Sequence, residues 1–166
     1  MIRWLVFDCG DTIMRVWPDY TGPMAHWPQV EAMPGAATML AALRGRYRLA
    51  QATNASESGA ELVRAALARV GLDEAFEVIV TARDLGVSKP DPAFYGAVLA
   101  ACGCAPDEAV MVGDSLALDV RPARAAGMRA VWYCVRGDPA EGGEADATIT
   151  DLRDLPVALA RLDAGP

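Results

Sequence analysis

Polar side chains that can act on a ligand follow three short apolar runs of this chain. One run near the amino terminus stops at Asp8, a second ends at Thr53 and Asn54, and a third ends just before Asp114. Such runs suit strands buried on both faces of a parallel sheet, and ligands bind beyond the carboxyl ends of those strands. A lone aspartate at a strand end often only caps a turn, but three polar strand ends predict a shared site.

Lys89 is the only lysine in the chain, against fourteen arginines. It lies in the segment Ser88–Pro92, beside the expected start of a helix. A compact ammonium suits a place where one point charge must reach a phosphate oxygen or a buried carboxylate. The alternative interpretation is an ordinary solvated lysine on the surface.

These residue types together predict a phosphate site. Asp8 and Asp114 would repel each other at one site, and a divalent cation relieves that repulsion. Hard oxygen ligands with room for water suit Mg²⁺. The ion and Lys89 would neutralise an oxyanion, Thr53 and Asn54 would donate hydrogen bonds, and a carboxylate can attack phosphorus in line.

Composition limits the classes of partner. The chain has 166 residues, 53% of them hydrophobic and 22% charged, which is typical of one globular domain. A net charge of −7 argues against tight binding of nucleic-acid phosphates. No apolar run approaches the roughly 20 residues that span a bilayer, and Asp8 and Asp11 interrupt the first apolar stretch too early for a signal peptide. We therefore expect a soluble cytoplasmic protein, without membrane binding, whose partner is a phosphorylated small molecule or macromolecule.

Cysteine and histidine offer little chemistry here. The four cysteines lack the spacing of zinc ligands, and nothing in their pattern demands disulfides. His26 is the only histidine, so a serine-type triad and a histidine-rich metal site both lack candidates. The chemistry must therefore rest on carboxylates, hydroxyls and the lysine.

Strand and helix signals alternate along the chain. Strands are expected at residues 2–7, 47–53, 76–81, 109–112 and 128–133, with a short one near Thr148. Helices are expected from Pro34, from Ser56 to Val70, from Asp91, from about Asp119 to Gly127 and from about Leu155. The alternation predicts an α/β protein with a three-layer Rossmann-like fold around a central parallel sheet. We expect a single domain over residues 1–166 without a large cap domain, and loops at 13–33 and 137–145.

Four short motifs, taken in order, resemble those of the haloacid dehalogenase-like hydrolases. They are FDCGDT around Asp8, ATNAS around Thr53, VSKPDPAFY around Lys89, and MVGDSLALDV followed by RPARAAGM. Each motif alone is weak, but the four together cover nearly the whole chain. The resemblance implies a Mg²⁺-dependent phosphohydrolase that forms an aspartyl-phosphate intermediate, and it implies that the strand before Asp8 lies centrally in the sheet.

The resemblance also implies roles for single residues. Asp8 is the nucleophile, and Lys89 orients it and stabilises charge. Thr53 and the backbone of Asn54 hold the phosphoryl group. The implied ligands of Mg²⁺ are Asp8, the Gly10 carbonyl and Asp114. Asp119 belongs to the same implied metal site but lies one layer further from the ion.

The chain departs from the family pattern two residues after the nucleophile. Phosphatases of this family usually carry a second aspartate there, which protonates the leaving alkoxide and later activates water. This chain has Gly10 at that position, and Asp11 is the neighbouring acid that could replace it. General acid–base help contributes about 10²–10⁴-fold, so we expect slow turnover of alkyl phosphates and a preference for aryl or acyl phosphates.

Residues 13–33 stand where relatives with a helical cap insert it. Twenty-one residues are too few for a helical bundle, so we expect a short flap and an open site. The flap carries Trp17, Tyr20, His26 and Trp27. These side chains either cover a hydrophobic edge, line the site or form a contact between copies of the chain. In this family an open site goes with macromolecular substrates or with a neighbouring subunit that serves as lid.

Three other interpretations compete with a phosphohydrolase. A dehalogenase would use Asp8 on carbon, but it needs no metal carboxylate and wants a closed apolar pocket. A phosphoacceptor receiver domain usually carries its acidic pair at the first strand and its phosphoacceptor on a later one, which the Thr53 and Asp114 motifs do not match. The serious rival is a non-catalytic domain that binds Mg²⁺ and phosphate, or a protein, because Gly10 has lost the acid.

Overall fold

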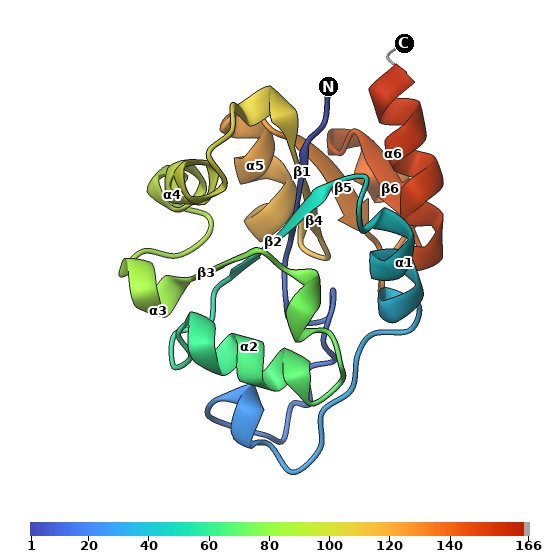
Figure 1. Ribbon diagram of the computed structural model, residues 1–166. Helices are drawn as coiled ribbons and strands as arrows, with labels where there is room; N and C mark the ends of the chain where they lie inside the picture. Colours follow the sequence, from blue (N-terminus) through green and yellow to red (C-terminus); the bar gives the residue numbers. More distant parts are fainter. Residues whose placement is uncertain (165–166) are drawn as a thin grey trace.

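The computed structural model describes residues 1–164 and contains one six-stranded sheet (Figure 1). The strands run in the order β3-β2-β1-β4-β5-β6, and every neighbouring pair is parallel. Their bounds are β1 (Trp4–Phe7), β2 (Arg48–Thr53), β3 (Val78–Thr81), β4 (Ala109–Gly113), β5 (Arg129–Tyr133) and β6 (Ala147–Ile149). The predicted parallel α/β sheet is confirmed. Because the strand order reverses beside β1, the residues that follow β1 lie at the crevice where such sheets bind ligands.

Helices cover both faces of the sheet, which gives the predicted three layers. Figure 1 shows α4 (Pro92–Cys102) and α5 (Arg121–Ala125) on one face, and α1 (Ala36–Leu43) and α6 (Leu155–Ala164) on the other. The α2 helix (Ala60–Ala68) lies on the same face as α1 and α6, since its Val63 and Leu67 belong to the apolar cluster that contains residues of those two helices. Strand β1 is buried on both sides: Leu5 and Phe7 face one cluster, and Trp4 and Val6 face the other.

The start of α2 differs from the prediction. Ser56 was expected to cap this helix, but the cap position is Gly59 and the helix begins at Ala60. The Asp84 carboxylate accepts a hydrogen bond from the Ala60 N–H at 2.8 Å and so supplies the cap from a distant segment. Residues 56–59 are thereby left as a loop beside the carboxyl end of β2.

Other boundaries differ for local reasons. The expected helix from about Asp119 begins earlier, as a π-helical turn over Leu116–Val120 that leads into α5. The Ser115 hydroxyl caps that turn by accepting from the Leu118 N–H at 3.1 Å. The expected loop 137–145 contains a 3-10 helix over Pro139–Glu144, and a short helix α3 (Ala82–Leu85) that was not expected follows β3.

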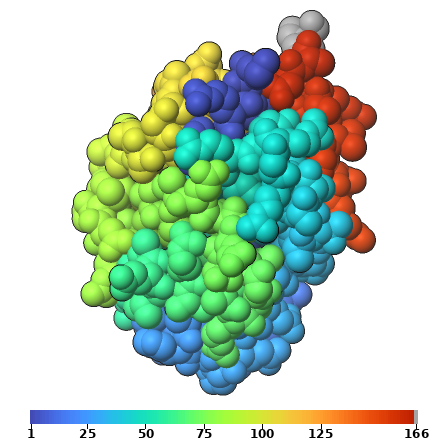
Figure 2. All heavy atoms as spheres, in the orientation of Figure 1, coloured from blue at the N-terminus to red at the C-terminus, as the bar shows by residue number. Residues whose placement is uncertain are grey.

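The flap, defined as residues 13–33, contains one regular element, a 3-10 turn over Met24–His26. Figure 2 shows it (blue) in contact with α2 (green). Trp27 is the buried aromatic residue of the flap. Its ring nitrogen donates to the carbonyls of Thr21 at 3.1 Å and Gly22 at 3.0 Å.

Among the helices of residues 1–164, none is long and apolar enough to cross a membrane.

Candidate active site

Asp8 follows β1 directly and stands at the centre of the sheet edge. The chain turns tightly after it, because the N–H groups of Thr12, Ile13 and Met14 all point to the Cys9 carbonyl at 2.9–3.3 Å. This turn brings the Thr12 hydroxyl back to Asp8, where it donates to Oδ2 at 3.3 Å. The Asp8 carboxylate is thus held by its own loop.

Lys89 is buried at the same edge and reaches two carboxylates. Its Nζ donates to Asp8 Oδ1 at 2.7 Å and to Asp119 Oδ1 at 2.6 Å. Burial alone would lower the pKa of this ammonium, but the Asp8 and Asp119 charges outweigh burial and raise it. Lys89 therefore remains charged, and with 4% of its surface exposed it is not the solvated lysine of the alternative interpretation.

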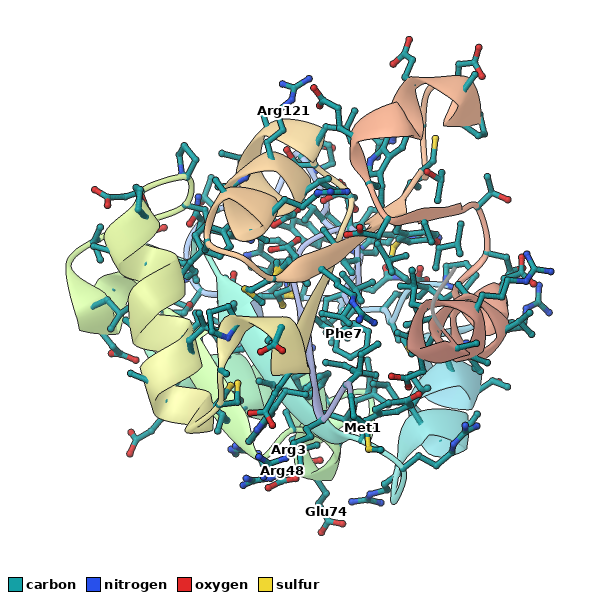
Figure 3. The ribbon with its side chains drawn as sticks, turned by 90° about the horizontal axis from the view of Figure 1, so that it is seen from above. Met1, Arg3, Phe7, Arg48, Glu74 and Arg121 are labelled. Atoms are coloured by element: carbon teal, nitrogen blue, oxygen red, sulfur yellow. The ribbon has the colours of Figure 1, made fainter. Side chains whose placement is uncertain are left out.

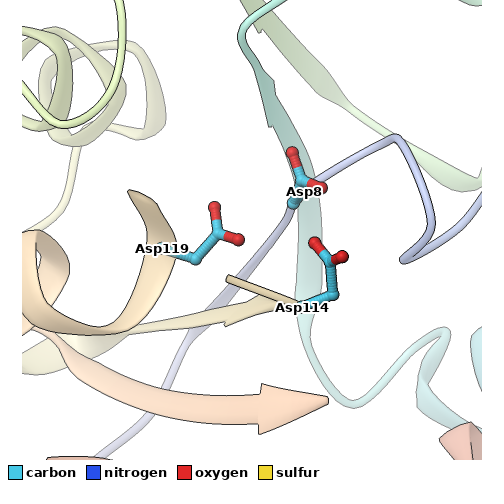
Figure 4. Close-up of side chains that lie close together, drawn as sticks. All are labelled: Asp8, Asp114 and Asp119. Carbon is cyan, nitrogen blue, oxygen red and sulfur yellow. The ribbon is translucent and has the colours of Figure 1, made fainter. Parts of the chain in front are cut away.

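Asp8, Asp114 and Asp119 form one group of carboxylates (Figure 4). One oxygen of each lies within 4.8 Å of the others. Burial, together with the nearby Asp8 and Asp11 charges, raises the pKa of Asp114 to about 6. Burial and the Asp8 charge likewise raise the pKa of Asp119. A cluster of hard oxygen donors whose mutual repulsion a cation would relieve fits Mg²⁺.

Both oxygens of Asp119 already have partners in the protein. Oδ1 accepts from Lys89, and Oδ2 accepts from the Ser115 N–H at 3.0 Å. Gly113 makes this arrangement possible, since a Cβ there would lie 2.3 Å from the Asp119 carboxyl carbon. This geometry makes Asp119 an anchor for Lys89, and sequence reasoning missed the need for glycine at position 113.

Thr53 and Asn54 lie beside these groups at the end of β2. Thr53 is buried, and its hydroxyl accepts from the Ala55 N–H at 3.3 Å. The Asn54 amide pairs with the backbone of Lys89: its Oδ1 accepts from the Lys89 N–H at 2.8 Å, and its Nδ2 donates to the Lys89 carbonyl at 3.0 Å. The Asn54 side chain therefore fixes the lysine loop, a role that the sequence did not reveal.

Asp11 lies outside the group of three carboxylates. Its backbone is left-handed with φ 55°, and its carboxylate accepts from the Val16 N–H at 2.9 Å. The other oxygen lies 3.6 Å from a guanidinium nitrogen of Arg136. A Cβ added at Gly10 would lie 2.9 Å from a methyl group of Val16, so the missing acid also has little room. That Asp11 replaces this acid stays a prediction.

A cavity of about 270 Å³ opens beside the candidate site. Gly10, Thr53 and Asn54 line one end of it. The flap and α2 line the rest, through residues that include Met24, Trp27 and Val63. The flap thus forms part of the wall of this cavity; that the flap lines the active site stays a prediction.

Comparison with known proteins gives the same assignment as the motifs. The family model of the haloacid dehalogenase-like hydrolases matches residues 8–127, which include every predicted site residue. Phosphoserine phosphatase of Thermus thermophilus is 42% identical over 130 residues, which make up 76% of this chain and 51% of that protein. This chain therefore spans about half the length of the curated relative.

Solved structures agree with the fold. The crystal structure of an uncharacterized protein from Listeria monocytogenes serotype 4b has a TM-score of 0.85 at 25% identity, over 98% of this chain and 99% of that one. A phosphatase of the same superfamily from Thermococcus onnurineus has a TM-score of 0.69 at 36% identity, over 78% of this chain and 59% of that one.

Proposed function

Because this chain belongs to the haloacid dehalogenase-like hydrolases, we propose that it is a Mg²⁺-dependent phosphohydrolase acting through a phosphoryl intermediate on Asp8. The observation that carries the proposal is the buried Lys89 ammonium, bonded to Asp8 at 2.7 Å within a cluster of three carboxylates. A buried cation between carboxylates is costly to stability, and an oxyanion site gives it a purpose.

In the proposed reaction an oxygen of Asp8 attacks phosphorus. The new bond joins that oxygen to phosphorus, and the bond from phosphorus to the leaving oxygen breaks. Water then attacks the phosphorus of the acyl phosphate, which releases inorganic phosphate and restores the carboxylate. Thr12 and Lys89 orient Asp8, while Lys89, Thr53 and the backbone after Thr53 stabilise the charge on the phosphoryl oxygens.

Asp8, Asp114 and the Gly10 carbonyl are the proposed holders of Mg²⁺. When bound, the ion would neutralise charge on the phosphoryl group. Asp119 fits a different task, since its side chain is only 1% exposed, against 12% for Asp8, and its oxygens accept from Lys89 and from the Ser115 N–H. We assign to it the positioning of Lys89.

Because residue 10 is glycine, no side chain at this position can donate a proton to the leaving group. Asp11 is the acid nearest in sequence, but Val16 and Arg136 hold its carboxylate. We therefore propose that the enzyme acts best on phosphates whose leaving group needs little protonation, such as aryl and acyl phosphates.

Phosphate release from an aryl phosphate and an acyl phosphate tests the proposal, with and without Mg²⁺. We expect release that requires Mg²⁺ and that Asp8→Asn abolishes. Release no faster than that of Asp8→Asn from either compound would instead support the non-catalytic domain that binds Mg²⁺ and phosphate or a protein.

A further inference from the structure

The cavity beside the site is continuous with the residues assigned to the phosphoryl group. Gly10, Thr53 and Asn54 line it, together with residues of the flap and of α2. A substrate whose phosphorus lies against Asp8 would therefore place its leaving group in this cavity. The chemistry of the walls then decides which leaving groups fit.

The walls are largely apolar. Trp27 and Met24 come from the flap, and Leu62, Val63 and Ala66 come from α2. Trp27 and Val63 belong to the buried residues of the protein, whereas Met24 and Leu62 are half-buried. Apolar surface of this kind favours an apolar ligand group over water.

The flap wall is held in place by α2. Arg69 is the residue that caps the carboxyl end of this helix. Its guanidinium donates to three flap carbonyls: those of Ala25 at 3.2 Å, Trp27 at 2.5 Å and Pro28 at 3.3 Å. The Trp27 ring is tied back to the flap by its own hydrogen bonds. The cavity is thus preformed, which reduces the ordering that a ligand must impose.

Charge gives the cavity a preference as well. Glu57 is the only charged residue among those that line it, and neither lysine nor arginine is among them. Lys89, the cation of the site, is occupied by Asp8 and Asp119. A carboxylate or second phosphate in the cavity would lose water without gaining a cation, and it would meet the Glu57 charge.

We propose that this cavity is the leaving-group pocket and that it selects an uncharged, largely apolar group the size of a single ring. This inference rests on the proposed function of the Asp8 site. The volume is sufficient for one ring, because an apolar cavity of about 150 Å³ holds a benzene molecule and this one measures about 270 Å³. Anionic leaving groups are rejected.

Binding of phosphonates tests the pocket without turnover, because their P–C bond is not hydrolysed. Titration calorimetry in the presence of Mg²⁺ would compare methylphosphonate, benzylphosphonate and 4-carboxybenzylphosphonate. We expect benzylphosphonate to bind about tenfold or more tightly than either of the others. Equal affinities for the three compounds, or no binding of benzylphosphonate, would overturn the proposal.

Two variants assign the effect to the walls. Trp27→Ala should remove the advantage of benzylphosphonate and leave the affinity for methylphosphonate unchanged. Glu57→Gln changes an exposed side chain and should fold normally; it should strengthen binding of 4-carboxybenzylphosphonate alone. An unchanged preference in Glu57→Gln would contradict the assigned role of this charge.

Hydrolysis of acetyl phosphate separates this inference from the proposed function. Its acetyl group is too small to require the ring pocket, so its Asp8-dependent hydrolysis reports the chemistry alone. Hydrolysis of acetyl phosphate with no preference among phosphonates would sink the pocket and keep the enzyme. A clear preference for benzylphosphonate without hydrolysis would establish an apolar binding pocket but overturn the proposed function, and with it the assignment of the pocket to a leaving group.

Discussion

The two edges of the sheet carry ion pairs in opposite environments. At the carboxyl edge Lys89 pairs with Asp8 and Asp119 at 2.7 and 2.6 Å, and its side chain is 2% exposed. At the amino edge arginines pair with glutamates at the surface, where Figure 3 labels Arg3, Arg48 and Glu74. The Arg3 side chain, 3.2 Å from Glu108, is 53% exposed.

The difference in burial decides what each pair does. Water screens the exposed pairs, so they add little to stability. Removing one partner from a buried pair is far more damaging, because the remaining charge has no solvent to compensate it. The buried ion pairs of Lys89, which cost desolvation free energy, therefore lie at the edge that carries the candidate site. This placement favours a chemical role for them over a purely structural one.

Replacing the buried cation should have the largest effect. In Lys89→Met, Asp8 and Asp119 lose their shared partner, so we expect a loss of about 3–5 kcal/mol in the free energy of unfolding at neutral pH. Phosphate release should fall by at least about 10²–10³-fold, because the oxyanion loses its ammonium. Chemical denaturation and a phosphate assay measure the two effects. Retention of both stability and activity would remove the distinction between the two edges.

Adding an acid to the carboxyl edge should produce a gain. Gly10→Asp in a Val16→Ala background provides room for the new side chain, since Val16 is the neighbour that a Cβ at Gly10 meets. We expect hydrolysis of an alkyl phosphate to rise by about 10²–10⁴-fold relative to Val16→Ala alone. Aryl phosphate hydrolysis should change much less. An unchanged alkyl rate would refute the argument that the missing acid limits turnover.

Gly113→Ala should damage the buried pair indirectly. The added methyl group collides with the Asp119 carboxylate, which must move away from Lys89. We expect a loss of about 1–3 kcal/mol in stability, as for other overpacked sites, and at least a tenfold lower kcat. Gly96→Ala is the matched control, because a Cβ there meets nothing within 4 Å and Gly96 lies inside α4. A kcat equal to that of the control would contradict the role assigned to Asp119.

Lowering the pH should weaken the metal site. The pKa of Asp114 in the folded protein is raised from 3.8 to about 6, so below pH 6 a proton competes with Mg²⁺ for this carboxylate. We expect the Kd for Mg²⁺ to rise about tenfold per pH unit below 6, as measured by titration calorimetry.

Without Mg²⁺, the raised pKa of Asp114 makes the folded protein more stable at low pH, although low pH weakens Mg²⁺ binding. The stabilising contribution of Asp114 is present in full below pH 3.8 and is lost as the pH rises through about 6. The stability of the wild type relative to Asp114→Asn should therefore fall between pH 4 and pH 7. A difference that stays constant or grows with pH would show that Asp114 carries no raised pKa.

Breaking an exposed pair should have the smallest effect. Arg3→Met removes the contact with Glu108 at the amino edge, which water already screens. We expect a Tm within about 3 °C of the wild type and an unchanged kcat. A loss as large as that of Lys89→Met would mean that burial does not govern these pairs.

The sheet, and the meeting of the candidate site residues at one of its edges, could be predicted because their signals are local. Strand β1 is a short apolar run, and Asp8 stands at its end. Parallel strands bring their carboxyl ends to one edge, so Asp114 and Thr53 had to lie near Asp8. The lone lysine added a cation to the same place.

The remaining features depend on contacts between residues far apart in the chain. Asn54 binds the backbone of Lys89, 35 positions later, and Asp84 caps α2 from 24 positions away. No periodicity or spacing signals such pairs. The flap sequence has no helix or strand periodicity. The hydrogen bonds from Arg69 to the flap, and the cavity beside them, are therefore evident only in the three-dimensional structure.

The most direct test of the central claim is to look for the phosphoryl group on Asp8. The protein would be mixed with an excess of aryl phosphate and Mg²⁺ and quenched in acid, and its peptides would be weighed by mass spectrometry. We predict that the peptide containing Asp8 gains the mass of one phosphoryl group, and that the gain is absent from Asp8→Asn. Steady phosphate release with no labelled Asp8, or with the label on another residue, would contradict the account.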